Sequence, residues 1–349
     1  MKTYTITSEK KLPESQLEIA VEVAYDILAK HRVSALKKIS SNVSIPGFRV
    51  GHVPEHIVVQ KFGELAVLEE AAQGTIGDAL SEIAKEKNIS IVGEPHVSIS
   101  KIAPGNPLAF TITISVIPDV ALPDYKKIAA DINAKKPEEI CVSEKEIMDF
   151  IENVRKGYAH STAPAHTHED GKEHVHDLPE LTDEFVKKLG DFKTVEDLKN
   201  KVKENLLLEK TQKAREKKRL LIAEAVLKET PIEVPKALIE SELAKLLARF
   251  HDDISRMGMT PEDYLKNSKK TEEDIRKEWR PDAEKRGKLQ LVWNAISEKE
   301  KIVAPLEAIE EEVKHLLEHY KDADKDRTRA YVTMMMTNEK VFDFLEEQK

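Results

Sequence analysis

The segment 45–54 holds the residue types best suited to contacting another molecule. It reads Ile-Pro-Gly-Phe-Arg-Val-Gly-His-Val-Pro. Gly47 and Gly51 permit backbone angles that are closed to other residues, so a tight loop can carry Phe48 and Arg49 at its tip. An aromatic ring beside a guanidinium is typical of binding surfaces. We therefore expect this loop to bind a partner; the alternative is that Phe48 folds back onto the core of its own domain.

The flank of this loop indicates what kind of partner it binds. No Asp or Glu occurs between Lys30 and Pro54, although the whole chain has a net charge of -9. A local positive patch in an acidic chain points to an anionic partner. The basic residues of the flank and loop are Lys30, Arg32, Lys37, Lys38 and Arg49.

A second candidate site is a histidine-rich stretch in the middle of the chain. His166-x-His168 and His174-x-His176 form two imidazole pairs near acidic residues, a pattern that could hold Zn²⁺ or Ni²⁺. The alternative, which we favour, is a polar spacer, because nothing there preorganises the ligands. The sequence contains no nucleophile elbow, phosphate-binding loop or carboxylate pair of defined geometry. We therefore predict no catalytic site and no cofactor.

The composition indicates the type of architecture and the cellular compartment. A chain of 349 residues suggests two or three domains, and 34% charged with 5% aromatic residues is typical of an extended, helix-rich protein. The single cysteine, Cys141, excludes internal disulfides. The N-terminus lacks the apolar core of a signal peptide, and no apolar run reaches the ~20 residues that span a bilayer. We expect a cytoplasmic protein that does not bind membranes.

The first 120 residues or so read as an α+β domain. Apolar and polar residues alternate in Tyr4–Lys10 and Leu17–Val23, which predicts two antiparallel strands joined at Pro13. A helix over 24–39 leads into the loop, one or two helices continue to residue 88, and strands follow over 89–102 and 108–120. The binding loop therefore lies at one tip of this domain.

The rest of the chain reads as helical apart from two connecting segments. We predict a connecting arm with a strand near Ala129–Ile132 and a helix capped by Ser143, then a flexible linker over 160–177. Beyond it, an apolar stripe from Ile239 to Met257 and threonine caps at Thr260 and Thr271 predict successive helices. The last helices are expected over 305–320 and 326–347.

Gly47-Phe48-Arg49-Val50-Gly51-His52-Val53-Pro54 resembles the Gly-Phe-Arg-x-Gly-x-x-Pro signature of trigger factor, the bacterial ribosome-associated chaperone. The similarity extends through most of residues 1–155 and 178–349. The family's loop docks on the large ribosomal subunit beside the tunnel exit, against a ribosomal protein and rRNA. The resemblance implies this role for Gly47, Phe48, Arg49, Gly51 and Pro54, with Lys37 and Lys38 nearby. The family usually has lysine where this chain has Val50, and often again at His52.

The resemblance also implies the division of the chain. An α+β ribosome-binding domain (1–133), a connecting arm (134–159) and the linker (160–177) precede an all-α, elongated, trigger factor/SurA-like C-terminal domain (178–349). Most trigger factors carry an FKBP-type prolyl-isomerase domain where this chain has the linker. Some twenty residues cannot form it, so no isomerase activity is expected.

The helical domain is expected to hold nascent and unfolded polypeptides without ATP. Three consecutive methionines cannot all face one core, and Met is an adaptable residue of promiscuous surfaces. Three other functions remain open: a folding enzyme, a free holdase of the periplasmic SurA type, and a metal carrier that uses the linker. The free protein could form a homodimer, as some relatives do. The candidate client-binding residues are Leu316, Leu317, Tyr331, Met334, Met335 and Met336.

Overall fold

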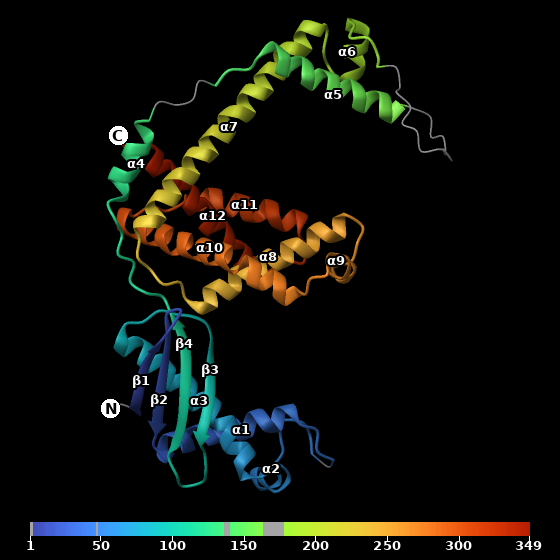
Figure 1. The fold of residues 1–349 in the computed structure, drawn as a ribbon. Coiled ribbons are helices and arrows are strands. Elements are labelled where there is room, and N and C mark those ends of the chain that lie inside the picture. Colours follow the sequence, from blue (N-terminus) through green and yellow to red (C-terminus); the bar gives the residue numbers. More distant parts are fainter. Residues whose placement is uncertain (1–2, 47, 136–139, 163–177) are drawn as a thin grey trace. The chain divides into compact units, whose positions relative to one another are not determined.

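The computed structural model describes residues 3–46, 48–135, 140–162 and 178–349 (Figure 1). The chain forms two compact units. The first comprises residues 1–122 and 229–302, and the second comprises residues 123–228 and 303–349. The first unit consists of β1 (Tyr4–Leu12), β2 (Gln16–Val23), α1 (Tyr25–Asn42), α2 (Glu55–Phe62), α3 (Glu64–Lys87), β3 (Ile91–Lys101), β4 (Leu108–Val116), α8 (Lys236–Arg256), α9 (Pro261–Ser268) and α10 (Glu272–Glu300).

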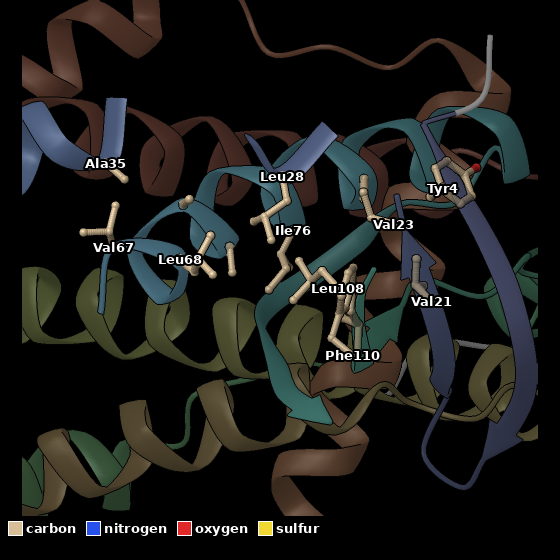
Figure 2. Packing of buried hydrophobic residues seen from close by; sticks show 14 of the residues in the cluster. Tyr4, Val21, Val23, Leu28, Ala35, Val67, Leu68, Ile76, Leu108 and Phe110 are labelled. Carbon is tan, nitrogen blue, oxygen red and sulfur yellow. The ribbon is translucent and has the colours of Figure 1, made fainter. Parts of the chain in front are cut away.

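The predicted α+β region is confirmed as a four-stranded antiparallel sheet in the order β1-β2-β4-β3. Alternation in β2 buries every second residue, and β4 does the same from Leu108 to Ile114. Helices α1 and α3 supply the residues that pack against this face, such as Leu28, Leu68 and Ile76 (Figure 2). Burying each of these aliphatic side chains contributes about 1.5–3 kcal/mol. The packed core holds α1, and therefore the loop that follows it, on a rigid base.

The turn between β1 and β2 is held by the segment that precedes α8. Glu14 and Ser15 both have positive φ values, 59° and 50°, which non-glycine residues adopt at a cost. The Glu233 carboxylate accepts hydrogen bonds from the Glu14 N–H at 2.7 Å and the Ser15 N–H at 3.3 Å. Arg280 in α10 bonds both Glu14 and Glu240. These contacts stabilise an otherwise unfavourable turn and tie the sheet to α8 and α10.

Gly93 in β3 permits a close approach to α8, and its replacement tests that packing. Its φ is +74°, and an added Cβ would lie 2.6 Å from the Ala237 Cβ. Gly105 has a similar φ of +72° but open space around it. Gly93→Ala is therefore expected to loosen the β3–α8 contact by about 1–3 kcal/mol more than Gly105→Ala, as measured by amide hydrogen exchange. Equal losses in the two variants would contradict the proposed close packing.

In the part of the second unit that the structure describes, every regular element is a helix. Arg155 Nε donates to the Pro179 carbonyl at 2.7 Å, and the Tyr158 and Phe185 rings meet edge to face at 5.3 Å, so α5 and α6 form a small core with the start of α7. None of the described helices is long and apolar enough to cross a membrane. The unit consists of α4 (Tyr125–Asn133), α5 (Glu144–Thr162), α6 (Asp183–Leu189), α7 (Val195–Glu229), α11 (Leu306–His319) and α12 (Lys325–Glu346).

The predicted strand near Ala129–Ile132 is wrong, because this segment lies in helix α4. Asp124 caps the helix by accepting a hydrogen bond from the Lys127 N–H at 3.2 Å. Tyr125 and Ala129, four residues apart, are both buried. The Asn133 side chain then donates to carbonyl groups at the end of α12, including that of Gln348 at 2.8 Å. A spacing of four residues on one face is the helical period, which a strand with its period of two does not produce.

The cap at Ser143 is present as predicted. Its side chain and its backbone N–H both donate to the Glu146 carboxylate at 2.9 Å. Lys210 of α7 bonds the same carboxylate, and these bonds, that from Lys210 foremost, lower the pKa of Glu146 to about 2. The start of α5 is thereby fixed to the middle of α7.

Candidate functional site

The candidate site is the loop between α1 and α2, and its backbone is held at both ends. Gly51, at a φ of +82°, donates its N–H to the Ser40 carbonyl at 2.9 Å. The Ser40 side chain is buried and its Oγ accepts the Val53 N–H at 3.1 Å. Ile45 and Val53 are also buried. The structure therefore fixes the base of the loop, while Gly47 lies outside the described residues.

The tip of the loop presents its side chains outward. Phe48 is 39% exposed and Val50 is 52% exposed, while Arg49 and His52 are exposed as well. Pro54 is half-buried at the start of α2. Two further backbone bonds shape the tip, from the Phe48 N–H to the Ile45 carbonyl and from the His52 N–H to the Arg49 carbonyl. A partner can thus reach an aromatic ring and a guanidinium on a loop whose base is held by hydrogen bonds.

The positive patch is smaller than the sequence suggests. Arg32 Nε lies 2.8 Å from a Glu64 carboxylate oxygen, and the guanidinium also bonds Glu55. The hydrogen bond from Arg32 lowers the pKa of Glu64. Lys38 pairs with Glu70. Residues 30–54 contain no acidic residue, but carboxylates of α2 and α3 lie beside this segment in the folded protein.

Lys37 and Arg49 retain the charge of this patch. Both side chains are exposed, and neither has an ion pair with any residue that the structure describes. Lys38 remains 57% exposed although it is paired with Glu70. The loop therefore offers an anionic partner Arg49 at its tip and Lys37 at its base, with Lys38 partly neutralised.

The candidate client-binding residues lie on the hairpin of α11 and α12 and differ in exposure. Tyr331 is 55% exposed and Met335 is 40% exposed. Leu316, Leu317 and Met336 instead pack against the small core of this hairpin, formed by Ile309, Val313 and Val332, and Met334 is half-buried. An open cavity of about 520 Å³ at the end of the hairpin is lined by Leu316, Tyr320, Ala323, Asp324, Arg327, Thr328 and Tyr331.

Sequence reasoning missed several exposed apolar residues. Met257 is the last residue of the apolar stripe expected from Ile239, but it lies just beyond the end of α8 and is 67% exposed. Tyr320, at 66% exposure, ends α11 beside the cavity, and Val303 is 79% exposed. The Met-Gly-Met turn at 257–259 was the one available signal, since a glycine there ends the helix and turns both methionines outward.

The metal hypothesis concerns residues that lie outside the described part of the chain. His166, His168, His174 and His176 are not among the residues that the structure describes. His160, at the start of the predicted linker, lies in helix α5. Within the described ranges, no group of three or more His, Cys, Asp or Glu side chains is arranged to hold a metal ion.

Comparison with known proteins assigns both ends of the chain to one family. Residues 5–154 match the family model described as bacterial trigger factor protein, and residues 194–349 match the model of the bacterial trigger factor C-terminus. Only residues 155–193 lie between the matches. Because ordinary domains have roughly 50 residues or more, no FKBP-type isomerase domain is inserted there.

Individual relatives agree with the family models. The trigger factor of Halothermothrix orenii is 28% identical, over 97% of this chain and 98% of that protein. That of Alkaliphilus metalliredigens is 27% identical, over 90% of this chain and 88% of its own length. A solved structure reported as "Promiscuous Substrate Recognition in Folding and Assembly Activities of the Trigger Factor Chaperone" shares the fold, with a TM-score of 0.51 at 17% identity over 98% of this chain and 100% of its own. With both of its conserved regions matched in order, the chain belongs to the trigger factor family.

Proposed function

We propose that this protein is an ATP-independent chaperone that docks at the ribosomal tunnel exit through Phe48 and Arg49. The observation that carries the proposal is the loop itself. A partly exposed aromatic ring and a guanidinium that has no ion pair among the described residues lie on a tip whose base is fixed by Ser40 and Gly51. A loop that is held at its base loses less conformational entropy on binding than a free segment, which favours affinity. Docking on ribosomes places the protein in the cytoplasm.

Co-sedimentation with purified ribosomes tests this proposal. A variant in which residues 46–52 are replaced by a glycine-serine segment of equal length should stay in the supernatant, whereas the unaltered protein pellets. Circular dichroism should show that the helix content is unchanged, since Ile45 and Val53 at the buried ends of the loop are retained. If both proteins pelleted equally, the loop would not be the docking element.

Lysines at the positions of Val50 and His52 should strengthen binding. Both residues are exposed, so Val50→Lys with His52→Lys adds two cations without disturbing the core. If these positions face rRNA, each new phosphate contact should steepen the slope of log K against log salt by roughly 0.7–0.9. The control is His96→Lys with Ser98→Lys, which adds two lysines on the outer face of β3, opposite the core. An equal change of slope in the control would mean that only net charge matters.

We further propose that the protein does not catalyse prolyl isomerisation. The support is the short interval, residues 155–193, between the two regions that match the family. A protease-coupled prolyl-turnover assay should give the uncatalysed rate at any concentration of the protein. A rate close to that of an isomerase-containing trigger factor would refute this proposal and support the hypothesis that the protein is a folding enzyme.

The hairpin of α11 and α12 is the proposed client-holding surface. Tyr331 and Met335 are the exposed candidates, so Tyr331→Ser with Met335→Gln should raise the concentration needed to suppress client aggregation by about fivefold. Leu316, Leu317 and Met336 pack in the hairpin, so their substitution requires a separate check of helix content.

The matched control for this surface lies on α7. Leu207 and Leu208 are 42% and 72% exposed, and Leu207→Gln with Leu208→Gln removes similar apolar surface outside the hairpin. If the control impaired suppression as much as the hairpin variant, clients would bind exposed apolar residues in general. If the hairpin variant worked like the unaltered protein, the client surface would lie elsewhere.

A further inference from the structure

His315 and His319 form a pair of exposed imidazoles on the last turns of α11. They are four residues apart, and their ring centroids are 4.8 Å apart with an interplanar angle of 73°. Both side chains are exposed, so each imidazole ring can rotate toward a ligand without leaving a packed environment. Side chains at this spacing project from one face of a helix. The pair belongs neither to the loop at 45–54 nor to the histidine-rich linker.

The separation of the two rings matches that of two imidazoles on one metal ion. With metal–nitrogen bonds of about 2.0–2.1 Å, imidazoles in adjacent coordination positions have ring centroids roughly 4.5–5.2 Å apart. The observed 4.8 Å lies inside that range. Two histidines at positions i and i+4 of a helix are also the pair of zinc ligands in the His-Glu-x-x-His motif. Small rotations of two exposed rings can therefore aim one nitrogen of each at a shared ion.

The surroundings decide which class of ion fits. Glu311 precedes His315 by one turn on the same face and adds negative charge beside the pair. Among the described residues no third ligand completes a closed site, so water fills the other coordination positions. Imidazole suits Zn²⁺, Ni²⁺ and Cu²⁺, with Cu²⁺ bound most tightly, whereas Mg²⁺ and Ca²⁺ take oxygen ligands.

We propose that His315 and His319 form a two-ligand site for Cu²⁺, Ni²⁺ or Zn²⁺ at the C-terminal end of α11. An ion held across one helical turn opposes fraying of that end, because unfolding the turn separates the ligands. Tyr320, the next residue, lines the cavity at the end of the hairpin together with Leu316 and Tyr331. The metal therefore stabilises one wall of this cavity.

The test uses the full chain with the linker histidines removed, since these would bind metal as well. In this background His160, His166, His168, His174 and His176 are all changed to Ser. Cu²⁺ is the probe, followed by electron paramagnetic resonance, which reports the number of bound nitrogens, and by competition with a chelator for affinity. We expect one Cu²⁺ with two imidazole nitrogens, and His319→Gln should weaken its binding at least about tenfold.

Two further variants test whether Cu²⁺ binding depends on the spacing of the two histidines or only on the number of histidines. His319→Gln with Glu318→His restores a pair at spacing three on the helix and should recover tight binding. His319→Gln with Lys321→His keeps the same number of histidines but places the second one beyond the end of α11, so binding should stay weak. Circular dichroism without metal should be identical for all variants. Equal Cu²⁺ affinity in the background protein and in His319→Gln would overturn the proposal and leave the pair as an aromatic contact only.

Discussion

Replacing Phe48 and Arg49 together by alanine is expected to weaken ribosome binding at least ~30-fold, which corresponds to about 2 kcal/mol. Aromatic and arginine anchors that become buried in an interface carry most of its binding energy, whereas exposed rim charges carry little. Phe48 supplies a ring that is already partly exposed, and Arg49 has no ion pair with the described residues that it would have to give up. The double substitution should therefore lower the affinity for ribosomes and leave the stability of the fold almost unchanged.

Helix α2 of the same domain offers a matched control. Lys61 and Phe62 are also a cation next to an aromatic residue, and Phe62 is 39% exposed, as Phe48 is. Lys61→Ala with Phe62→Ala removes the same kinds of side chain a short distance along the chain. Its dissociation constant for ribosomes should stay within about threefold of that of the unaltered protein. Equal weakening in the two double variants would show that binding depends on general surface character and not on the loop.

The second large effect is expected at Arg219, whose guanidinium joins α7 to α12. It lies 2.8 Å from Glu339, 2.9 Å from Asp343 and 3.1 Å from Glu346, and it sits over the Phe342 ring at 5.1 Å from its centroid. The side chain is only 12% exposed, and that of Glu346 is 13% exposed. Arg219→Ala is expected to cost about 3 kcal/mol at this contact, because it leaves the nearly buried Glu346 carboxylate with Arg215 as its remaining partner among the described residues.

Amide hydrogen exchange along α12 measures this cost locally, which suits a chain with two compact units. Lys213→Ala is the control, since Lys213 pairs with Glu209 one turn away on the exposed surface and its loss should hardly change the protection of α12. Arg219→Lys keeps the charge but loses the planar fork, so its effect should be intermediate. If Arg219→Ala and Lys213→Ala gave the same protection, the cluster would not hold α12 in place.

The same cluster makes the α7–α12 contact sensitive to acid. Burial alone would raise the pKa of the Glu346 carboxyl, but hydrogen bonds from Arg215 and Arg219 outweigh it and the pKa is lowered. A carboxyl whose pKa is lower in the folded state stabilises the fold above its unfolded pKa and loses this contribution as pH falls through the folded value. Protection of α12 should thus decline below about pH 4.5, and Arg219→Ala should flatten that decline.

Features that depend on neighbours along the chain could be predicted from the sequence. The strands follow from alternation, the caps at Ser143, Thr260 and Thr271 from local hydrogen-bond chemistry, and the exposed loop tip from its glycines. Helix α4 was not predicted, because only Tyr125 and Ala129 mark the buried face of this nine-residue helix. Its Asn133 side chain bonds the end of α12, more than 200 residues further along, and no local pattern reveals that contact.

Charge pairing between distant segments accounts for most of what sequence reasoning missed. The flank of the loop seemed uniformly basic because Glu55, Glu64 and Glu70 come later in the chain, yet two of its five cations are paired with them. Arg219 ends a strongly charged stretch of α7, and its carboxylate partners lie 120 or more residues away, so no local pattern shows that its side chain is nearly buried. Likewise, no local pattern shows that residues 229–302 form one compact unit with 1–122.

Photo-crosslinking from the loop to translating ribosomes tests the central proposal most directly. A benzophenone-bearing amino acid placed at Phe48 should crosslink to the large subunit beside the tunnel exit, and the same residue placed at Phe62 should give little product. This result is expected because Phe48 lies on the proposed contact tip, whereas Phe62 ends α2. Efficient crosslinking from Phe62 with none from Phe48 would contradict docking through the loop.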